Sequence, residues 1–210
     1  MSNVVLYDYW RSSASYRVRI ALNMLGIGYR TVPIDLLDGE QKNPDYLQLN
    51  PQGFVPTLVI DGQVMTQSLA IIEYLAERWP ESGLMPQDAA ARQQVRTLSY
   101  AIAMDIHPIC NTHVAAYVTT ISDKAEAREE WMKHFIGMGL HKLEAMLGKC
   151  DGAFSHGDKP TMADVCLVPQ VYNARRWDVD LRDLKRIVAI DERCAGLPGF
   201  QAAHPDSAKP

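Results

Sequence analysis

The stretch that decides the fold covers residues 50–80, "NPQGFVPTLVIDGQVMTQSLAIIEYLAERWP". It holds two short β-prone apolar runs, Thr57–Ile60 and Gln63–Thr66, separated by Asp61-Gly62. An aspartate followed by a glycine between such runs is a strong signal for a two-residue β-hairpin. Apolar residues then recur at helical spacing after Ser68, and serine is a preferred N-cap. We therefore predict an antiparallel hairpin followed by a helix that Ser68 caps.

A strand, a helix and a second strand are predicted ahead of this stretch. Residues 4–7 form a β-prone apolar run, and Ser12 or Ser13 is placed to cap a helix that ends at Gly26. Residues 29–34 resemble a second strand, in which Pro33 indicates an edge position or the end of the strand. A strand–helix–strand crossover gives a parallel pair. Together with the hairpin it predicts one small mixed sheet covered by helices.

The remainder of the chain has a helical pattern. Residues 80–88, "PESGLMPQD", contain two prolines and a glycine and resemble a linker. The clearest helical segments beyond it are 89–106, 124–147 and 161–177. Thr161 and Asp164 have the spacing of a capping box, with aspartate in place of glutamate. We predict an α/β domain at residues 1–82 and an all-α domain at residues 89–210.

Composition excludes several classes of protein. The chain has 210 residues, a net charge of −4 and no basic stripe, which disfavours a nucleic-acid partner. The N-terminus lacks the pattern of a signal peptide, and no apolar run approaches the roughly 20 residues that cross a bilayer, so we expect no membrane association. The cysteines and histidines lack the spacing of metal ligands, so we expect no metal and a cytoplasmic protein with reduced thiols.

Two serine-containing segments could carry chemistry. A nucleophilic Ser12 or Ser13 would need a general base, and no G-x-S-x-G elbow is present. The two serines could merely cap a helix. Alternatively, one hydroxyl at the positively polarised helix start could donate a hydrogen bond to a bound thiolate and lower its pKa. Gln67 and Ser68 open the later helix, where they could hold a carboxylate or serve only as a cap.

Three further segments have both a structural and a functional interpretation. The Val55-Pro56 bond is trans by default, whereas a cis bond would turn the Val55 backbone toward an extended peptide. His107 precedes Pro108 at a helix interruption, and a lone histidine at such a position more often has a structural role than a functional one. The arginine pair in "NARRW", residues 173–177, could form a surface salt bridge or clamp a dianionic substrate.

These residues resemble the cytosolic glutathione transferases. The segments "VPTL" and "SLAIIEYL" are similar to that family as a whole, whereas the serine motif in "RSSASYRVRIAL" is similar to its zeta class, and "ARRWDVDL" is another specific part of the resemblance. That class contains the maleylacetoacetate and maleylpyruvate isomerases. The resemblance covers nearly the whole chain. It implies a thioredoxin-like α/β domain, an all-helical domain, a homodimer and glutathione as cofactor.

The resemblance also implies roles for single residues. Ser12, with Ser13 beside it, is expected to stabilise the glutathione thiolate as the catalytic group, and Pro56 is expected to be cis. Arg11 and Arg176 are expected to hold the carboxylates of a small dicarboxylic keto acid. The positions expected to contact glutathione are Ser12, Ser13, Ala14, Gln41, Val55, Gln67, Ser68, His107, Asn111, Thr112 and His113.

The implied reaction is glutathione-dependent cis–trans isomerisation of maleylacetoacetate or maleylpyruvate in the degradation of tyrosine or aromatic acids. Position 14 is alanine where the family motif often has cysteine, so a mechanism that needs this cysteine is not expected. Some maleylpyruvate isomerases have an arginine pair where this chain has Thr112-His113, which favours maleylacetoacetate. The alternatives are conjugation or dehalogenation of small α-halo acids, and a non-catalytic interaction protein.

Overall fold

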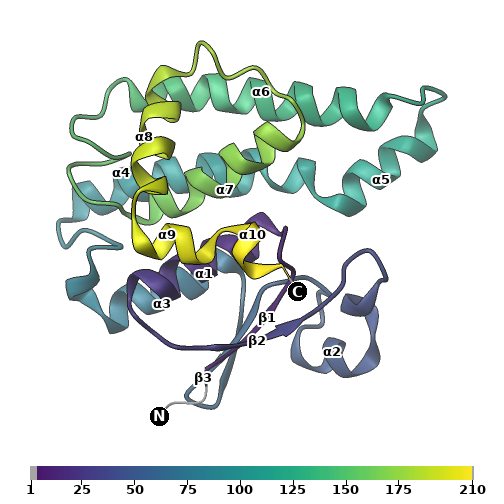
Figure 1. The fold of residues 1–210 in the computed structure, drawn as a ribbon, viewed down its shortest axis with the longest axis horizontal. Coiled ribbons are helices and arrows are strands. Elements are labelled where there is room, and N and C mark those ends of the chain that lie inside the picture. Colours follow the sequence, from purple (N-terminus) through teal and green to yellow (C-terminus); the bar gives the residue numbers. More distant parts are fainter. Residues whose placement is uncertain (1–3, 210) are drawn as a thin grey trace. The chain divides into compact units, whose positions relative to one another are not determined.

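The computed structural model of the chain describes residues 4–209, and contacts group these residues into two units (Figure 1). One unit runs to Met85 and includes the residues from Ala195 onward, and the other is Pro86–Cys194. The predicted division into domains 1–82 and 89–210 stays a prediction. The contact groups differ from it because they place the C-terminal segment with the first unit. Residues 1–3 and 210, which the predicted domains include, lie outside the described residues.

The first unit contains one four-stranded mixed sheet. Its strands are β1 Val5–Asp8, β2 Arg30–Pro33, β3 Thr57–Ile60 and β4 Gln63–Thr66, in the order β2-β1-β3-β4. β1 and β2 are parallel, and β3 is antiparallel to both β1 and β4. Asp61 and Gly62 both have positive φ, 51° and 77°, as the predicted two-residue hairpin requires. Pro33 ends β2, which is an edge strand, so both predicted roles of this proline are met.

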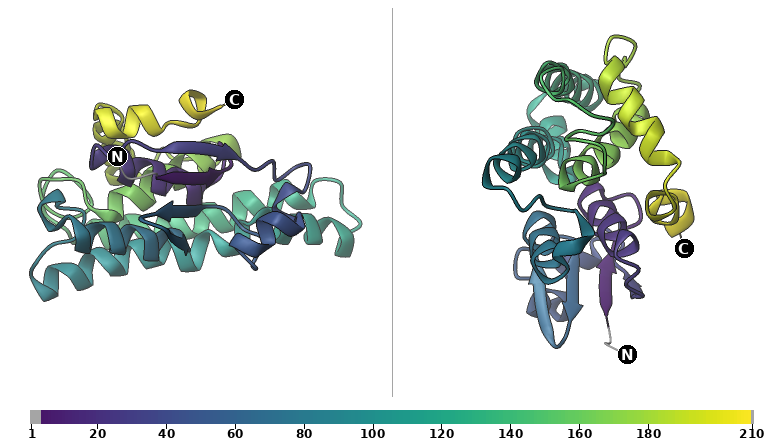
Figure 2. Two further views of the ribbon diagram at one scale, coloured as in Figure 1. Left: turned by 90° about the horizontal axis from the view of Figure 1, so that it is seen from below. Right: turned by 90° about the vertical axis from the view of Figure 1, so that its left-hand side faces the viewer.

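Among the described residues of the first unit, five segments are α-helices: α1 Ser13–Met24, α2 Pro44–Leu49, α3 Ser68–Arg78, α9 Pro198–Ala203 and α10 Pro205–Ala208. α1 packs against α3 and α9, and Figure 2 shows the C-terminal segment beside the N-terminal one. Ser12 caps α1 as predicted, because its side chain accepts a hydrogen bond from the Ser15 N–H. The predicted cap at Ser68 is wrong. Ser68 is the first helical residue, and Gln67, at φ 67°, occupies the cap position without a side-chain cap bond.

The second unit is helical. Its elements are α4 Ala89–Tyr100, a π-helical segment Ala101–Ile106, α5 Thr112–Ile121, α6 Ala127–Leu147, α7 Met162–Arg176 and α8 Lys185–Ala195. The three predicted segments are therefore confirmed in outline, although the first changes to π-helix before Pro108. The predicted capping box is also confirmed, because the Asp164 carboxylate accepts the Thr161 N–H at 2.7 Å. No helix within residues 4–209 is long and apolar enough to cross a membrane.

Candidate functional site

Three predicted site segments are connected to the sheet at the same end of its strands. In the register of the sheet Tyr7 pairs with Thr57, and Thr57 pairs with Thr66. The end of β1, the start of β3 and the end of β4 therefore lie side by side. Ser12 follows the end of β1, Val55 precedes the start of β3, and α3 begins directly after the end of β4. The structure thus brings the residues that are predicted to contact the thiol, the peptide backbone and a carboxylate of glutathione to one end of the sheet.

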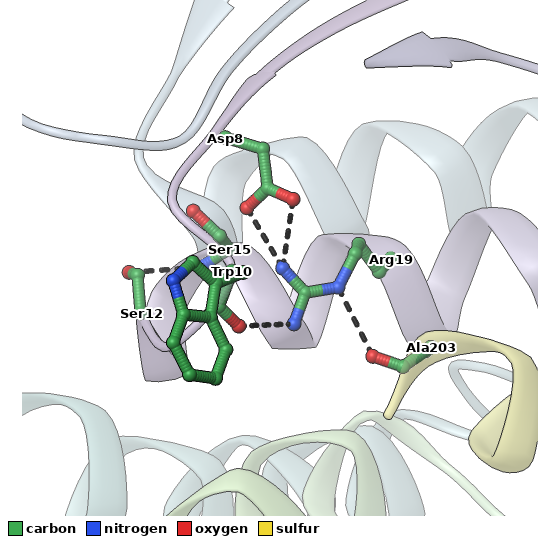
Figure 3. A network of polar contacts seen from close by, with 6 residues as sticks. All are labelled: Asp8, Trp10, Ser12, Ser15, Arg19 and Ala203. Atoms are coloured by element: carbon green, nitrogen blue, oxygen red, sulfur yellow. Dashed lines mark hydrogen bonds and ion pairs between the residues drawn. The ribbon is translucent and has the colours of Figure 1, made fainter. Parts of the chain in front are cut away.

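Ser12 stands at the junction of a tight turn and a helix. Its backbone N–H donates to the Tyr9 carbonyl at 2.8 Å, and its Oγ accepts the Ser15 N–H at 3.3 Å (Figure 3). A hydroxyl has one hydrogen to donate. Because the Ser15 N–H occupies a lone pair, the Ser12 hydrogen can point toward an anion at the positive end of α1. Ser13 is buried and Ala14 is half-buried in the first turn of the same helix.

The start of α3 has an unusual backbone. Gln67 has φ 67° and ψ 106°, outside the regions that non-glycine residues favour, and such strain is concentrated at functional sites. Its Nε2 donates to Gln52 Oε1 at 2.8 Å. The Ser68 Oγ accepts a hydrogen bond from Arg17 Nη1 at 3.3 Å, and Arg17 is only 2% exposed. Both predicted residues are thus held by partners, Gln52 and Arg17, that the sequence analysis missed.

The segment before β3 is fixed by two side chains. The Val55-Pro56 bond is cis, as the resemblance implies. The Phe54 carbonyl accepts hydrogen bonds from the Tyr46 hydroxyl at 2.5 Å and from Asn50 Nδ2 at 2.8 Å. Tyr46 also packs in a small core with Val55. The predicted peptide-pairing position therefore lies in a segment that α2 and the loop after it hold in place.

Gln41 lies next to this segment and offers an unsatisfied acceptor. A Cβ on Gly53 would stand 3.1 Å from the Gln41 carbonyl oxygen, so the two backbones approach closely. The side-chain Oε1 of Gln41 is buried and has no hydrogen-bond partner among residues 4–209. A buried amide oxygen without a donor is costly. An N–H of a peptide bound along this edge would satisfy it, which fits the predicted contact with glutathione.

Arg11 occupies the turn that precedes Ser12. Its Nη2 donates to the Tyr9 hydroxyl at 2.9 Å, and its guanidinium carbon lies 4.8 Å from the centre of the Trp10 ring. The side chain is half-buried. Stacking of this kind orients the planar guanidinium while leaving other N–H groups for a carboxylate.

The predicted site residues of the second unit lie around the start of α5 and near the end of α7. His107 follows the π-helical segment, Asn111 precedes α5, and Thr112 and His113 are exposed in the first turn of that helix. Their contact with glutathione stays a prediction from the resemblance.

The arginine pair near the end of α7 divides into two environments. Arg175 Nη1 forms an ion pair with Asp191 at 2.5 Å, which matches the structural interpretation of the pair. Arg176 is exposed, and its Nη1 donates to Asn173 Oδ1 at 3.4 Å. Arg175 is thus engaged in a salt bridge, and the clamp role of Arg176 stays a prediction.

Three of the protein's own thiols are poor nucleophiles. None of the four cysteines forms a disulfide bond, and three of them are buried. Burial raises the pKa of the Cys110 thiol to about 11, and it also raises the pKa values of Cys150 and Cys194. Because the thiolate is the reactive form, these side chains stay unreactive near neutral pH. Among residues 4–209, no three His, Cys, Asp or Glu side chains are grouped so as to hold a metal ion.

Comparison with known proteins adds independent evidence. Residues 2–77 match the family of the glutathione S-transferase N-terminal domain. The chain is 62% identical to the maleylacetoacetate isomerase of Rhizobium meliloti, over 100% of this chain and 99% of the relative. A holo structure of a zeta-class maleylpyruvate isomerase is 41% identical, with a TM-score of 0.93 over 97% of each chain. The maleylacetoacetate isomerase of Anaeromyxobacter dehalogenans with bound glutathione is also 41% identical, with a TM-score of 0.89 over 98% of this chain and 96% of that one.

Proposed function

The chain belongs to the zeta-class glutathione transferases, the family of the maleylacetoacetate and maleylpyruvate isomerases, and from this membership we propose how it works and on what. It is a glutathione-dependent cis–trans isomerase. We propose maleylacetoacetate as its substrate and the fumaryl isomer as its product. One observation best supports this function: Ser12, Val55 and the Gln67-Ser68 pair lie together at one end of the sheet.

Ser12 supplies the donor for the reactive sulfur. When bound, glutathione supplies a thiolate that adds to the cis double bond and leaves again after rotation about the bond that has become single. The Ser12 hydroxyl and the N-terminus of α1 favour the ionised sulfur, which lowers the pKa of the thiol. Val55, Gln67, Ser68 and Gln41 hold the peptide in place. No protein nucleophile is required, in keeping with the raised pKa values of the Cys110, Cys150 and Cys194 thiols.

The arginines act on the substrate. Negative charge builds up on the keto side of the substrate during the reaction, and a guanidinium within reach stabilises it. Arg11 is proposed for this role beside the sulfur, and Arg176 for a carboxylate. We further propose a cytoplasmic homodimer that serves aromatic or tyrosine degradation. Large exposed apolar side chains such as Phe54 and Val64 support self-association.

We expect Arg176→Ala to weaken substrate binding far more than glutathione binding. Loss of one charge-assisted contact should raise the KM for maleylacetoacetate roughly 10- to 100-fold, with the KM for glutathione changed less than about twofold. Arg175→Ala is the matched control. Because Arg175 is paired with Asp191, this variant should lose stability and keep its substrate KM. Equal losses for substrate and glutathione in Arg176→Ala would contradict the clamp role.

The function itself is tested by following the isomerisation of maleylacetoacetate and maleylpyruvate, each with and without glutathione. We expect glutathione-dependent turnover, with maleylacetoacetate preferred, because Thr112-His113 supplies no arginine pair for a second carboxylate. Preference for maleylpyruvate would reassign the substrate. Glutathione binding without turnover of either compound would favour conjugation or dehalogenation of α-halo acids. Absence of glutathione binding would favour an interaction protein.

A further inference from the structure

Arg19 is a buried arginine whose guanidinium connects four segments of the first unit. It is 1% exposed. Its Nη1 donates to both oxygens of Asp8 at 2.8 Å, its Nη2 to the Trp10 carbonyl at 2.9 Å and its Nε to the Ala203 carbonyl at 3.0 Å (Figure 3). The side chain therefore joins α1 to the end of β1, to the following turn and to the end of α9.

The bond to the Trp10 carbonyl acts on the turn that carries the catalytic hydroxyl. Trp10 and Arg11 are the central residues of the turn that the Ser12 N–H closes onto the Tyr9 carbonyl. Arg19 binds this turn at the Trp10 carbonyl, and Tyr9, the first residue of the turn, packs in a small core with Val55. The position of the Ser12 hydroxyl therefore depends on the Arg19 contact two residues away.

The C-terminal contact completes the arrangement. Ala203 is the last residue of α9, where helix carbonyls lack intrahelical partners and carry partial negative charge. α9 lies very close to α1, since a Cβ on Gly199 would stand 3.1 Å from the backbone nitrogen and Cγ of Met24. The Asp8 carboxylate balances the charge of Arg19. The Ala203 carbonyl fixes the Nε edge of the guanidinium plane, and with it the direction of Nη2 toward Trp10.

We propose that Arg19 is a positioning residue for the isomerase reaction. It holds the Ser12 hydroxyl at the reactive sulfur through the turn of residues 9–12, and the hydrogen bond to the Ala203 carbonyl keeps the Arg19 side chain itself in place. This inference rests on the proposed role of Ser12. A misplacement of the reacting groups by about 1 Å costs on the order of 100-fold in rate. The fork of a guanidinium sets such a position, whereas the single nitrogen of a lysine cannot reproduce the fixed directions of three separate N–H donors toward three acceptors.

The test is Arg19→Lys, which keeps the charge opposite Asp8 and loses the fork. We measure the pKa of glutathione bound to the protein from the ultraviolet absorbance of its thiolate, together with kcat, melting temperature and affinity for S-methylglutathione. We expect the thiol pKa to rise by about one unit, kcat at neutral pH to fall about tenfold, and affinity for the non-ionisable S-methylglutathione to change less than about twofold. Asp8→Asn is the matched control, because it weakens the ion pair and leaves the Trp10 acceptor in place. It should lower the melting temperature without raising the thiol pKa.

A lower melting temperature of Arg19→Lys with an unchanged thiol pKa would overturn the proposal and leave Arg19 a structural residue. If Arg19→Lys does not fold, Gly199→Ala decides the question. The added methyl displaces α9 from Met24, so the thiol pKa should rise by a few tenths, and an unchanged value would again overturn the proposal. Failure of the proposed function is a different result, in which the wild-type protein does not lower the thiol pKa of glutathione at all.

Discussion

Ser12→Ala should reduce kcat about 10²- to 10³-fold at neutral pH, because it removes the hydroxyl that we propose as the donor to the glutathione thiolate. The Ser12 Oγ accepts the Ser15 N–H at 3.3 Å, so its hydrogen is directed elsewhere, and the N-terminus of α1 adds positive potential. Without the hydroxyl, the pKa of bound glutathione should rise toward that of the free thiol. The measurements are kcat as a function of pH and titration of the bound thiol.

The same substitution also removes a helix cap, which costs about 1 kcal/mol of stability. Ser12→Thr keeps both the cap and the hydroxyl, and it should retain most of the activity. Ser13→Ala is the second control, since Ser13 is 7% exposed within the first turn. Full activity of Ser12→Ala, together with a large loss in Ser13→Ala, would transfer the role to Ser13. Full activity in both variants would assign thiolate stabilisation to the backbone N–H groups of α1.

Asp164→Ala should lower the free energy of unfolding by about 3 kcal/mol or more, measured by urea denaturation. The carboxylate is fully buried and accepts hydrogen bonds from the Ser155 N–H at 2.8 Å, the Thr161 N–H at 2.7 Å and the Thr161 hydroxyl at 3.2 Å. Alanine would leave two buried backbone N–H groups without partners, and each such group costs roughly 1–3 kcal/mol. Glutathione affinity should persist in the fraction that remains folded.

Asp88→Ala is the matched comparison in the same unit. Asp88 caps α4 by accepting the Ala91 N–H at 2.8 Å, but this cap is exposed to solvent. Water replaces the lost partner there, so the loss should be about 1 kcal/mol. If the two variants lost the same free energy of unfolding, burial would not explain the contribution of Asp164, and the prediction for Asp164→Ala would be wrong.

Local signals predicted the elements that depend on neighbouring residues. Asp61-Gly62 predicted the hairpin because its positive φ values depend on two adjacent residues. Ser12 predicted the start of α1 for the same reason. Ser68 failed as a cap because Gln67 adopts φ 67°, a conformation that tertiary contacts such as the Gln52 bond support and that no local pattern indicates.

The partners of the site could not be predicted, because they come from distant parts of the chain. Arg17 reaches Ser68 across 51 residues, and Arg19 reaches Ala203 across 184. Each arginine stands in the motif "YRVRIAL", which indicates a family and not a contact. The pattern of residues 198–208 is helical, and helical periodicity does not say against which unit a helix packs. The grouping of this segment with the sheet therefore appears only in three dimensions.

This last contact has a consequence for how the protein is made. A ribosome releases α1 long before α9, and at 5–20 residues per second the 184 residues between Arg19 and Ala203 take roughly 10–40 s to synthesise. Once residue 66 has been made, the nascent sheet has all four of its described strands, but the guanidinium still lacks the acceptor for its Nε and α1 still lacks the helix that packs against it. The unit that is translated first therefore cannot be completed until residues 198–208 have left the exit tunnel.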